Sequence, residues 1–411
     1  MKKFVILSYS ISGVGGGQMY QKNKLSYMKK MGYNVAAVYS TPGKIIINDL
    51  KKYEDNLIEL LSVNPMLLSR NQIAETIDKI SRLIGSLDED TIIEANNKTL
   101  SMWGEIIAQK YKCINFIYII DEKIGSLDPT IIDFFKFKRN KCELCGIKGE
   151  TYQMIFETDC VKDGYGYILP LVCNNVVDDY FHPVIDSVVI SDFNIGTIGR
   201  LEKAYIPTLV TEISNFAKNH QNLSITFLMI GDSPQKENID LINSTLCNNK
   251  NITLILTGAL FPIPLKLLES MDVFVSSAGS ARVSASISKP TITIDARDYC
   301  SIGILNYDTY NTVFRTTEEK ISISNKLDFI LQNDFYKTIK LEKYNKEADD
   351  LDEIFKMHLL KFENMKNSKK YYKFSDKKIP SKRKIEKLIL KLFGFNSYQK
   401  FKKVIFSKIN R

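Results

Sequence analysis

The strongest constraint on the fold of this 411-residue chain is a repeated alternation of short, continuous apolar runs with amphipathic stretches. The apolar runs lie at 4–10, 34–40, 91–95 and 113–120, and again at 193–199, 224–231, 251–258, 272–277 and 290–295. The amphipathic stretches lie at 18–32, 99–112, 206–219, 236–247, 264–270 and 281–288. Apolar runs that do not alternate with polar residues predict parallel strands buried on both faces, with helices between them.

The alternation restarts after about residue 190, and the chain is longer than one hydrophobic core usually serves. We therefore expect an α/β protein of two Rossmann-like domains with parallel sheets, facing one another across a cleft. The predicted limits are 1–175 and 176–345, followed by C-terminal helices and a basic tail at 346–411. A composition of 44% apolar and 25% charged residues suits a soluble protein, and no run of 18 apolar residues predicts a membrane span.

The first strand leads into a glycine-rich loop, "GVGGGQ" at 13–18. Gly13 and Gly15 fit the dinucleotide fingerprint, but its sixth position is Gln18 and the second predicted strand ends without a carboxylate. No Gly-Lys-Ser/Thr follows, which also excludes a Walker A loop. The loop still offers backbone N–H groups at a helix start, suited to an anion or a sugar hydroxyl. A plain strand-to-helix turn is the alternative.

Three strands of the second half end in glycine, at Gly199, Gly231 and Gly258. Ligands of open α/β sheets bind outside the carboxyl ends of the strands, where a glycine lets the backbone approach them. Arg200 and Lys203 directly follow the first of these glycines. A guanidinium fork and a mobile ammonium suit phosphate oxygens, so the pair predicts a phosphate site. A solvated basic pair is the alternative.

Six fragments, in order, resemble GT-B glycosyltransferases of the GT4 (retaining) type: the glycine loop, "LVCNNVVDDYFHP" at 171–183, "IGRLEKAY", "FLMIGDSP", "ILTGAL" and "LLESMDVFVSSAGSARVSASISKPTITID". The resemblance spans about residues 4–300 and implies a transferase that uses a nucleotide-sugar donor. It places donor-binding residues at Gly199, Gly231, Gly258, Ser277, Gly279, Ser280, Ala281 and Arg282. It assigns stabilisation of the leaving diphosphate to Arg200 and Lys203, and it puts Gly15, Gly16 and Gly17 on the opposite wall of the cleft.

One departure from the family pattern concerns two glutamates, E-x7-E, that grip sugar and ribose hydroxyls in the family. The matching stretch, 275–290, contains no acid, and Val283 stands at about the place of the second glutamate. The sequence keeps a small-residue turn whose amides suit a diphosphate. The departure puts the identity of the donor, and activity itself, in question.

Other candidate groups are few. Asp121 follows a predicted strand and could orient an acceptor hydroxyl, and Asp295 holds a similar place in the second half. The three histidines, at 182, 220 and 358, are expected to be structural or solvated. Cys142 and Cys145 have zinc-knuckle spacing, which Cys160, Cys173 and His182 could complete, but two loop thiols are the favoured interpretation. We expect no metal and no cofactor besides the nucleotide-sugar substrate.

The end of the chain is strongly basic, with sixteen Lys and Arg against two acids over 366–411, while the whole chain carries a formal net charge of +9. The rest of the chain is therefore mildly acidic. Ile385, Leu388, Ile389 and Leu392 have helical spacing among lysines, and Tyr398, Phe401 and Ile405 extend the pattern. Residues 376–411 are predicted to bind an anionic membrane surface. A packed or solvated helix is the alternative, and nucleic acid is not expected as a partner.

Together these features predict a cytoplasmic glycosyltransferase, peripheral at the inner face of the plasma membrane. It would use a glycan or lipid-linked acceptor in bacterial surface polysaccharide biosynthesis. Two alternatives remain open: a non-catalytic GT-B binding or scaffold partner of a glycan-assembly complex, and a nucleotide-sugar epimerase.

Overall fold

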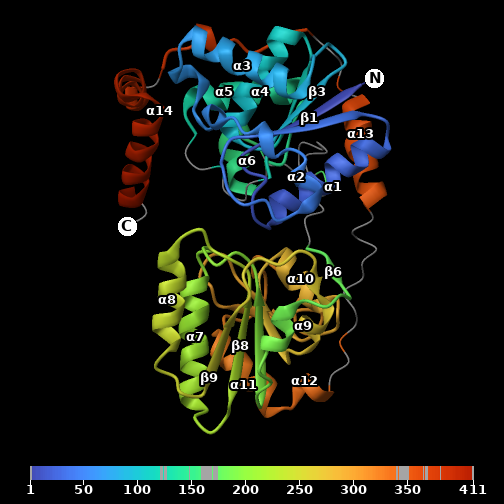
Figure 1. Ribbon diagram of the computed structural model, residues 1–411, viewed down its shortest axis with the longest axis vertical. Coiled ribbons are helices and arrows are strands. Elements are labelled where there is room, and N and C mark those ends of the chain that lie inside the picture. Colours follow the sequence, from blue (N-terminus) through green and yellow to red (C-terminus); the bar gives the residue numbers. More distant parts are fainter. Residues whose placement is uncertain are drawn as a thin grey trace. The chain divides into compact units, whose positions relative to one another are not determined.

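The computed structural model describes residues 2–120, 124, 127–147, 149–158, 169, 175–338, 341, 351–363, 365, 369–379 and 381–409. The chain forms two compact units (Figure 1). Unit 1 consists of Met1–Ser12, Gln21–Leu171 and Leu351–Arg411, and unit 2 of Gly13–Tyr20 and Val172–Asp350. The division falls inside the first helix, whose initial turn groups with unit 2.

Unit 1 contains a five-stranded parallel sheet in the order β2-β1-β3-β4-β5. Its strands are β1 (Lys3–Ser8), β2 (Asn34–Tyr39), β3 (Ile92–Ala95), β4 (Ile114–Tyr118) and β5 (Leu144–Cys145). The strand order reverses between β1 and β3, which makes a topological switch point. All residues of β1 and β3 are buried, as their continuous apolar runs predict.

The helices of unit 1 cover both faces of this sheet. They are α1 (Gly16–Lys30), α2 (Asn48–Lys51), α3 (Arg70–Ile84), α4 (Lys98–Tyr111), α5 (Pro129–Asn140), α6 (Gly149–Phe156), α13 (Leu351–Glu363) and α14 (Ser381–Ile409), with short 3-10 turns at Glu54–Asn56, Glu59–Ser62, Pro65–Leu67 and Phe374–Asp376. A capping box between Ser69 and Gln72 begins α3, and the Asn97 side chain caps α4. Ile77, Trp103 and other residues of α3 and α4 pack against Ile93 and Ala95 on one face of β3.

The C-terminal segment of the chain is integrated into unit 1. Phe355 and Phe362 of α13 pack with Tyr27 of α1 and Phe4 of β1, on the face of the sheet opposite α3 and α4. Farther along, the Tyr372 N–H donates to Glu105 Oε1 at 2.8 Å. Glu105 is fully buried and its other oxygen accepts from the buried Lys138 at 2.9 Å. A buried charge network of α4 and α5 therefore holds the returning chain.

Unit 2 contains a six-stranded sheet in the order β13-β12-β11-β7-β8-β9. Its strands are β7 (Phe193–Ile198), β8 (Ile225–Ile230), β9 (Ile252–Leu256), β11 (Val273–Ser276), β12 (Thr291–Ile294) and β13 (Ser301–Ile304), and a separate parallel pair joins β6 (Val177–Asp178) to β10 (Ile263–Pro264). All neighbours in the large sheet are parallel except β13, which runs antiparallel to β12.

The helices of unit 2 form two layers on this sheet (Figure 1). On one face lie α7 (Ile206–Asn219), α8 (Lys236–Leu246), α11 (Ile323–Gln332) and α12 (Phe335–Thr338), which share a core with Phe193, Phe227 and Val273. On the other lie α9 (Leu265–Glu269), α10 (Gly279–Ala285) and the 3-10 turn Pro183–Ser187, packed on Leu228 and Phe274. Among the described residues, no helix has the length and apolar character needed to cross a membrane.

Candidate functional site

Most of the sequence-predicted donor residues follow β7 and β11, the two strands at the switch point of unit 2, while Gly231 and Gly258 follow β8 and β9. The neighbouring parallel strands β7 and β11 lead into helices on opposite faces, α7 on one and α10 on the other. Their two loops therefore diverge at the carboxyl edge of the sheet, where open α/β sheets bind ligands. The Ile198 N–H donates to Ser276 Oγ at 3.1 Å, which ties the ends of the two strands together.

Glycine is required where the loop after β7 meets the loop after β8. A Cβ on Gly231 would lie 1.8 Å from the Gly199 carbonyl oxygen, well inside van der Waals contact. The Gly199 N–H donates to Ile230 O at 2.9 Å, and the Leu201 N–H to Asp232 O at 3.0 Å. These bonds hold the backbone on either side of Arg200 and fix its place at the sheet edge.

Lys203 lies beside the same glycine. A Cβ on Gly199 would lie 3.6 Å from Lys203 Nζ and 3.1 Å from the Tyr205 hydroxyl. The ammonium also lies 5.5 Å from the centre of the Tyr205 ring, within the range of a cation–π contact. Tyr205 is buried, and burial raises the pKa of its hydroxyl above the ordinary range. The hydroxyl therefore stays protonated and can donate a hydrogen bond.

Sequence reasoning missed Glu202, which forms an ion pair with Arg200. One Arg200 Nη lies 3.1 Å from Glu202 Oε1, while the other carboxylate oxygen is buried and accepts no hydrogen bond from the described residues. More than half of the Arg200 side chain remains exposed. The carboxylate thus fixes one edge of the guanidinium and leaves the rest accessible. Its place between two cations in "GRLEK" is the signal that could have identified it.

The turn between β11 and α10 supplies backbone donors. Ala278 has φ 53° and ψ −131°, a conformation that residues with a Cβ rarely adopt. Its N–H donates to Thr312 O at 2.8 Å, whereas the N–H groups of Gly279 and Ser280 donate to no described residue. Two open N–H groups at the switch point suit an anion. Arg282 and the buried Ala281 follow on α10, a helix of seven residues.

The structure shows the surroundings of Val283, the residue that the sequence resemblance puts at about the place of the second glutamate. Val283 is buried in the apolar cluster with Leu267, Phe274 and Met271. That position offers packing and no hydrogen bond to a sugar hydroxyl. The third glycine-ended strand leads to Gly258, which has φ 72° and bridges to Gly231.

Asp295 accepts hydrogen bonds from the loops of unit 2 that carry Arg297 and Arg315. Its carboxylate accepts from Arg297 N and Nε at 2.9 Å, from an Arg297 Nη at 2.6 Å and from Arg315 N at 2.7 Å. These donors, above all the Arg297 side chain, hold the pKa of Asp295 well below its ordinary value. Because both oxygens are occupied, Asp295 is not available to an acceptor hydroxyl in this arrangement.

The glycine loop groups with unit 2, so its place beside the β7 loop can be described. Residues Gly13–Tyr20 belong to that unit, and α1 begins at Gly16, followed by Gly17. A Cβ on Gly15 would lie 3.7 Å from Arg200 Cδ and 3.8 Å from Arg200 Nε. Residue 15 and the Arg200 side chain therefore lie side by side, at a distance of ordinary van der Waals contact for a Cβ.

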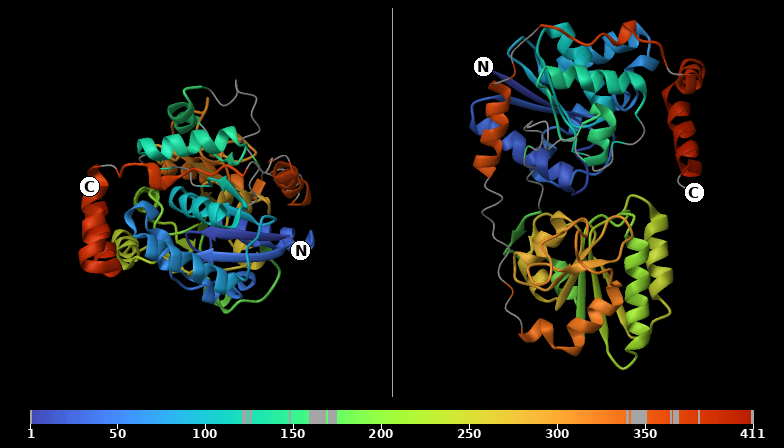
Figure 2. Two further views of the ribbon diagram at one scale, coloured as in Figure 1. Left: turned by 90° about the horizontal axis from the view of Figure 1, so that it is seen from above. Right: turned by 180° about the vertical axis from the view of Figure 1, so that it is seen from behind.

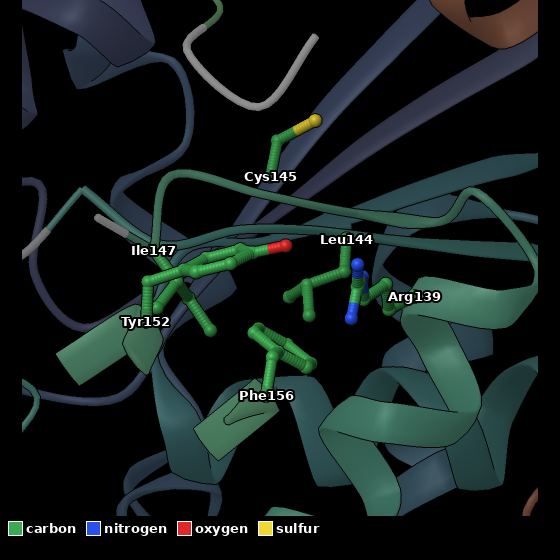
Figure 3. Close-up of a pocket in the computed structure, with 6 residues that line it drawn as sticks. All are labelled: Arg139, Leu144, Cys145, Ile147, Tyr152 and Phe156. Carbon is green, nitrogen blue, oxygen red and sulfur yellow. The ribbon is translucent and has the colours of Figure 1, made fainter. Parts of the chain in front are cut away.

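The other candidates either fall outside the described residues or make contacts of their own. Asp121, Cys160 and Cys173 fall outside the described residues. Cys145 is buried, which raises the pKa of its thiol to about 12, and it lines a small, mainly apolar pocket with Tyr152, Phe156 and Arg139 (Figure 3). The histidines have structural contacts: His182 Nδ1 accepts from Val184 N at 3.2 Å, His220 pairs with Asp328 at 2.6 Å, and His358 is buried against Tyr118 and Phe355.

Comparison with known proteins identifies the fold. No family model matches the sequence, and no curated protein matches it. A glycosyltransferase from Rickettsia africae ESF-5 has a similar structure, with a TM-score of 0.59, 14% identity, and coverage of 89% of this chain and 100% of the other. HepE of Anabaena, solved with UDP and glucose, gives a TM-score of 0.58 at 14% identity, with coverage of 89% and 100%. The chain therefore has the two-domain, Rossmann-like fold of the GT-B glycosyltransferases.

Proposed function

We propose that this protein transfers a sugar from a nucleotide-sugar donor to an acceptor. The observation that carries the proposal is that Arg200 and Lys203 follow β7, while the open N–H groups of Gly279 and Ser280 follow β11, the neighbouring strand at the switch point of unit 2. Cations and N–H groups are what a leaving diphosphate needs, because they stabilise the negative charge that it gains when the bond between the sugar and the diphosphate breaks and the acceptor oxygen bonds to the sugar. HepE, which shares the fold, is solved with UDP and glucose, and this supports a nucleotide-sugar donor.

In the proposed transfer, each of the candidate site residues has its own role. Arg200 and Lys203 bind the diphosphate oxygens, and Glu202 holds one edge of the guanidinium in place. Gly199, Gly231, Gly258 and the Ser277–Arg282 turn bring backbone close to the donor. Gly15, Gly16 and Gly17 border this site, a role that the approach of Gly15 to Arg200 supports. Asp121 orients the acceptor hydroxyl.

The finer parts of the proposal rest on the sequence resemblance. They are a retaining, hexosyl-type GT4 reaction without metal or cofactor, a lipid-linked glycan acceptor, and a place in bacterial surface polysaccharide synthesis. A lipid-linked acceptor would require the enzyme to work at the inner face of the plasma membrane, and the basic C-terminal segment is consistent with such a location.

One observation favours a second candidate, a protein that binds the donor without transferring its sugar. The stretch 275–290 has no carboxylate, and Val283 is packed in an apolar cluster. The diphosphate contacts would then remain, while the contacts to the sugar would be lost. Release of nucleoside diphosphate from a nucleotide sugar separates the two candidates, because only the transferase produces it.

The first experiment is a thermal-shift screen of the whole protein against nucleoside diphosphates and nucleotide sugars. At least one should raise the melting temperature, since a ligand of the native state stabilises it by mass action. Arg200→Ala should weaken that ligand at least tenfold, because a hydrogen bond to a charged group contributes about 1.5–3 kcal/mol. Lys218→Ala, an exposed cation in the last turn of α7, is the matched control and should bind normally. A screen in which no nucleotide stabilises the protein would exclude both candidates.

A further inference from the structure

The C-terminal helix α14 has two faces with different environments. Leu390 and Tyr398 are buried in the core cluster of unit 1, beside Leu67 and Trp103. The Tyr398 hydroxyl donates to Glu386 at 3.0 Å, and Gln399 donates to Ser62 Oγ at 2.9 Å. Arg383 pairs with Asp128, the N-cap of α5, at 3.0 Å. These contacts thus pack one face of α14 against unit 1.

The other face carries large apolar side chains in solvent. Ile385, Leu388, Leu392 and Phe393 are 61%, 54%, 61% and 66% exposed. Leu388, Leu392 and Phe393 follow Ile385 by three, seven and eight residues, and this spacing puts all four on one side of the helix. The helical geometry is broken directly afterwards, at Gly394, which has φ 75°. Figure 2 shows the two segments of α14 on either side of this break. Four neighbouring exposed apolar side chains of this size mark an interaction site.

The sequence prediction requires one correction. Tyr398 was assigned to the membrane-facing pattern, but its ring is 1% exposed and belongs to the core of unit 1. Ile389 packs partly against the same core. The side chains beyond Phe401, Ile405 among them, fall outside the described side chains. Among the described side chains of α14, the exposed apolar face therefore lies in the first half of the helix.

We infer that this face, together with Lys384, Lys387 and Lys391, is an interfacial surface that binds an anionic lipid bilayer. The inference rests on the proposed function, which places the enzyme at a membrane, and it adds the surface that contacts the membrane. Two of these lysines are exposed and all lie within one turn of the apolar residues. On a bilayer, the apolar side chains enter the boundary between headgroups and acyl chains, and the lysines contact the anionic headgroups. Both contacts contribute to binding.

Charge selects the bilayer over a second copy of this chain. A two-fold pairing of the same face would bring the three lysines of one copy close to those of the other, and like charges oppose that arrangement. Nucleic acid would use the lysines but would leave Leu388, Leu392 and Phe393 without an apolar partner. An anionic bilayer satisfies both kinds of side chain.

Because α14 is anchored in unit 1, the surface would hold that unit at the membrane. The docked face buries Leu390 and Tyr398, so deletion of the segment would disrupt the core as well as the surface. Substitution of exposed side chains tests the surface without this damage. Leu388→Asp/Phe393→Asp removes the apolar contact, and Lys384→Ser/Lys391→Ser removes two charges. Met357→Asp/Leu360→Asp on α13 is the matched control, since these side chains are 46% and 49% exposed.

The measurement is co-sedimentation of the full-length protein with vesicles of phosphatidylcholine alone or with equal parts of phosphatidylglycerol. The unchanged protein and the α13 control should bind the anionic vesicles, with affinity that falls as salt rises. Each α14 variant should bind at least tenfold more weakly while keeping the wild-type melting temperature. Unchanged binding by the α14 variants, or a concentration-dependent dimer that they abolish, would overturn the inference. Nucleotide-induced stabilisation of the α14 variants reports separately on the proposed function.

Discussion

The ion pair of Lys24 and Glu94 lies in the interior of unit 1, where neither side chain is exposed. Their charged atoms are 4.0 Å apart, and the ammonium lies 4.8–5.6 Å from the centres of the Phe4, Phe355 and Phe362 rings. Burial lowers the pKa of Lys24 from 10.5 to about 8, against the opposing effect of Glu94. Two of the three rings belong to α13, so the pair links the returning chain to α1.

This pair should give unit 1 a characteristic pH dependence. Between pH 8 and 10.5 the unfolded lysine keeps its proton while the folded one loses it. The unfolded state then binds more protons, so the contribution of Lys24 to the free energy of unfolding rises with pH across this window. The double variant Lys24→Met/Glu94→Leu removes that contribution. Urea unfolding at several pH values should show wild type gaining on the variant from pH 8 to pH 10, and parallel curves would contradict the assignment.

Single residues also show where sequence reasoning reached its limit. The positions of Arg200 and Lys203 followed from strand ends, because a glycine-ended run predicts the carboxyl edge of a sheet. The engagement of Asp295 by Arg297 and Arg315 could not be predicted, since the second arginine approaches from a loop 20 residues later. Glu202 was overlooked because a single acid between two cations resembles a solvated charge cluster.

Among the elements, α14 contributes to stability through one face only. Leu390→Ala should lower the free energy of unfolding by about 2–5 kcal/mol, the usual cost of truncating a buried leucine. Leu392→Ala, on the exposed side of the same helix, should change it by less than about 0.5 kcal/mol. Equilibrium urea denaturation measures both. Equal effects of the two substitutions would mean that α14 does not pack on unit 1 in solution.

The strands and helices were predictable to the extent that local pattern specifies them. The nine predicted apolar runs correspond to β1, β2, β3, β4, β7, β8, β9, β11 and β12, because strands of a parallel sheet covered by helices are continuous apolar runs. The region 41–69 was not predicted, since its 3-10 turns lack a sustained period. The two-residue β5 is too short to recognise, and the antiparallel β13 depends on a tertiary partner, β12.

At the scale of the whole molecule, the two units have separate cores, so their responses to ligand should differ. A nucleoside diphosphate bound through Arg200, Gly279 and Ser280 stabilises the unit that contains them. Scanning calorimetry should show the ligand shifting the transition of unit 2 more than that of unit 1. Leu390→Ala identifies the transition of unit 1, because it lowers that one. If the ligand raised only the melting temperature of the unit 1 transition, the nucleotide site would lie in unit 1.

The return of the C-terminal segment to unit 1 was beyond local sequence patterns. The residues that hold it, such as Tyr372 and its acceptor Glu105, are separated by 267 positions. No period or motif in 351–411 specifies which core it joins. The fold of each sheet was therefore predictable, whereas the completion of unit 1 by distant residues was not.

That return sets an order of events during translation. The core of unit 1 needs two parts of the chain, and most of unit 2 lies between them in the sequence. A ribosome therefore synthesises all of unit 2 before it synthesises α13 and α14. At about 5–20 residues per second, the last segment takes several seconds to emerge. Throughout that interval, Phe4 and Lys24 lack the aromatic rings that later enclose them. The half that begins the chain is thus the last to mature, and a nascent chain halted near residue 350 would be a natural client for chaperones.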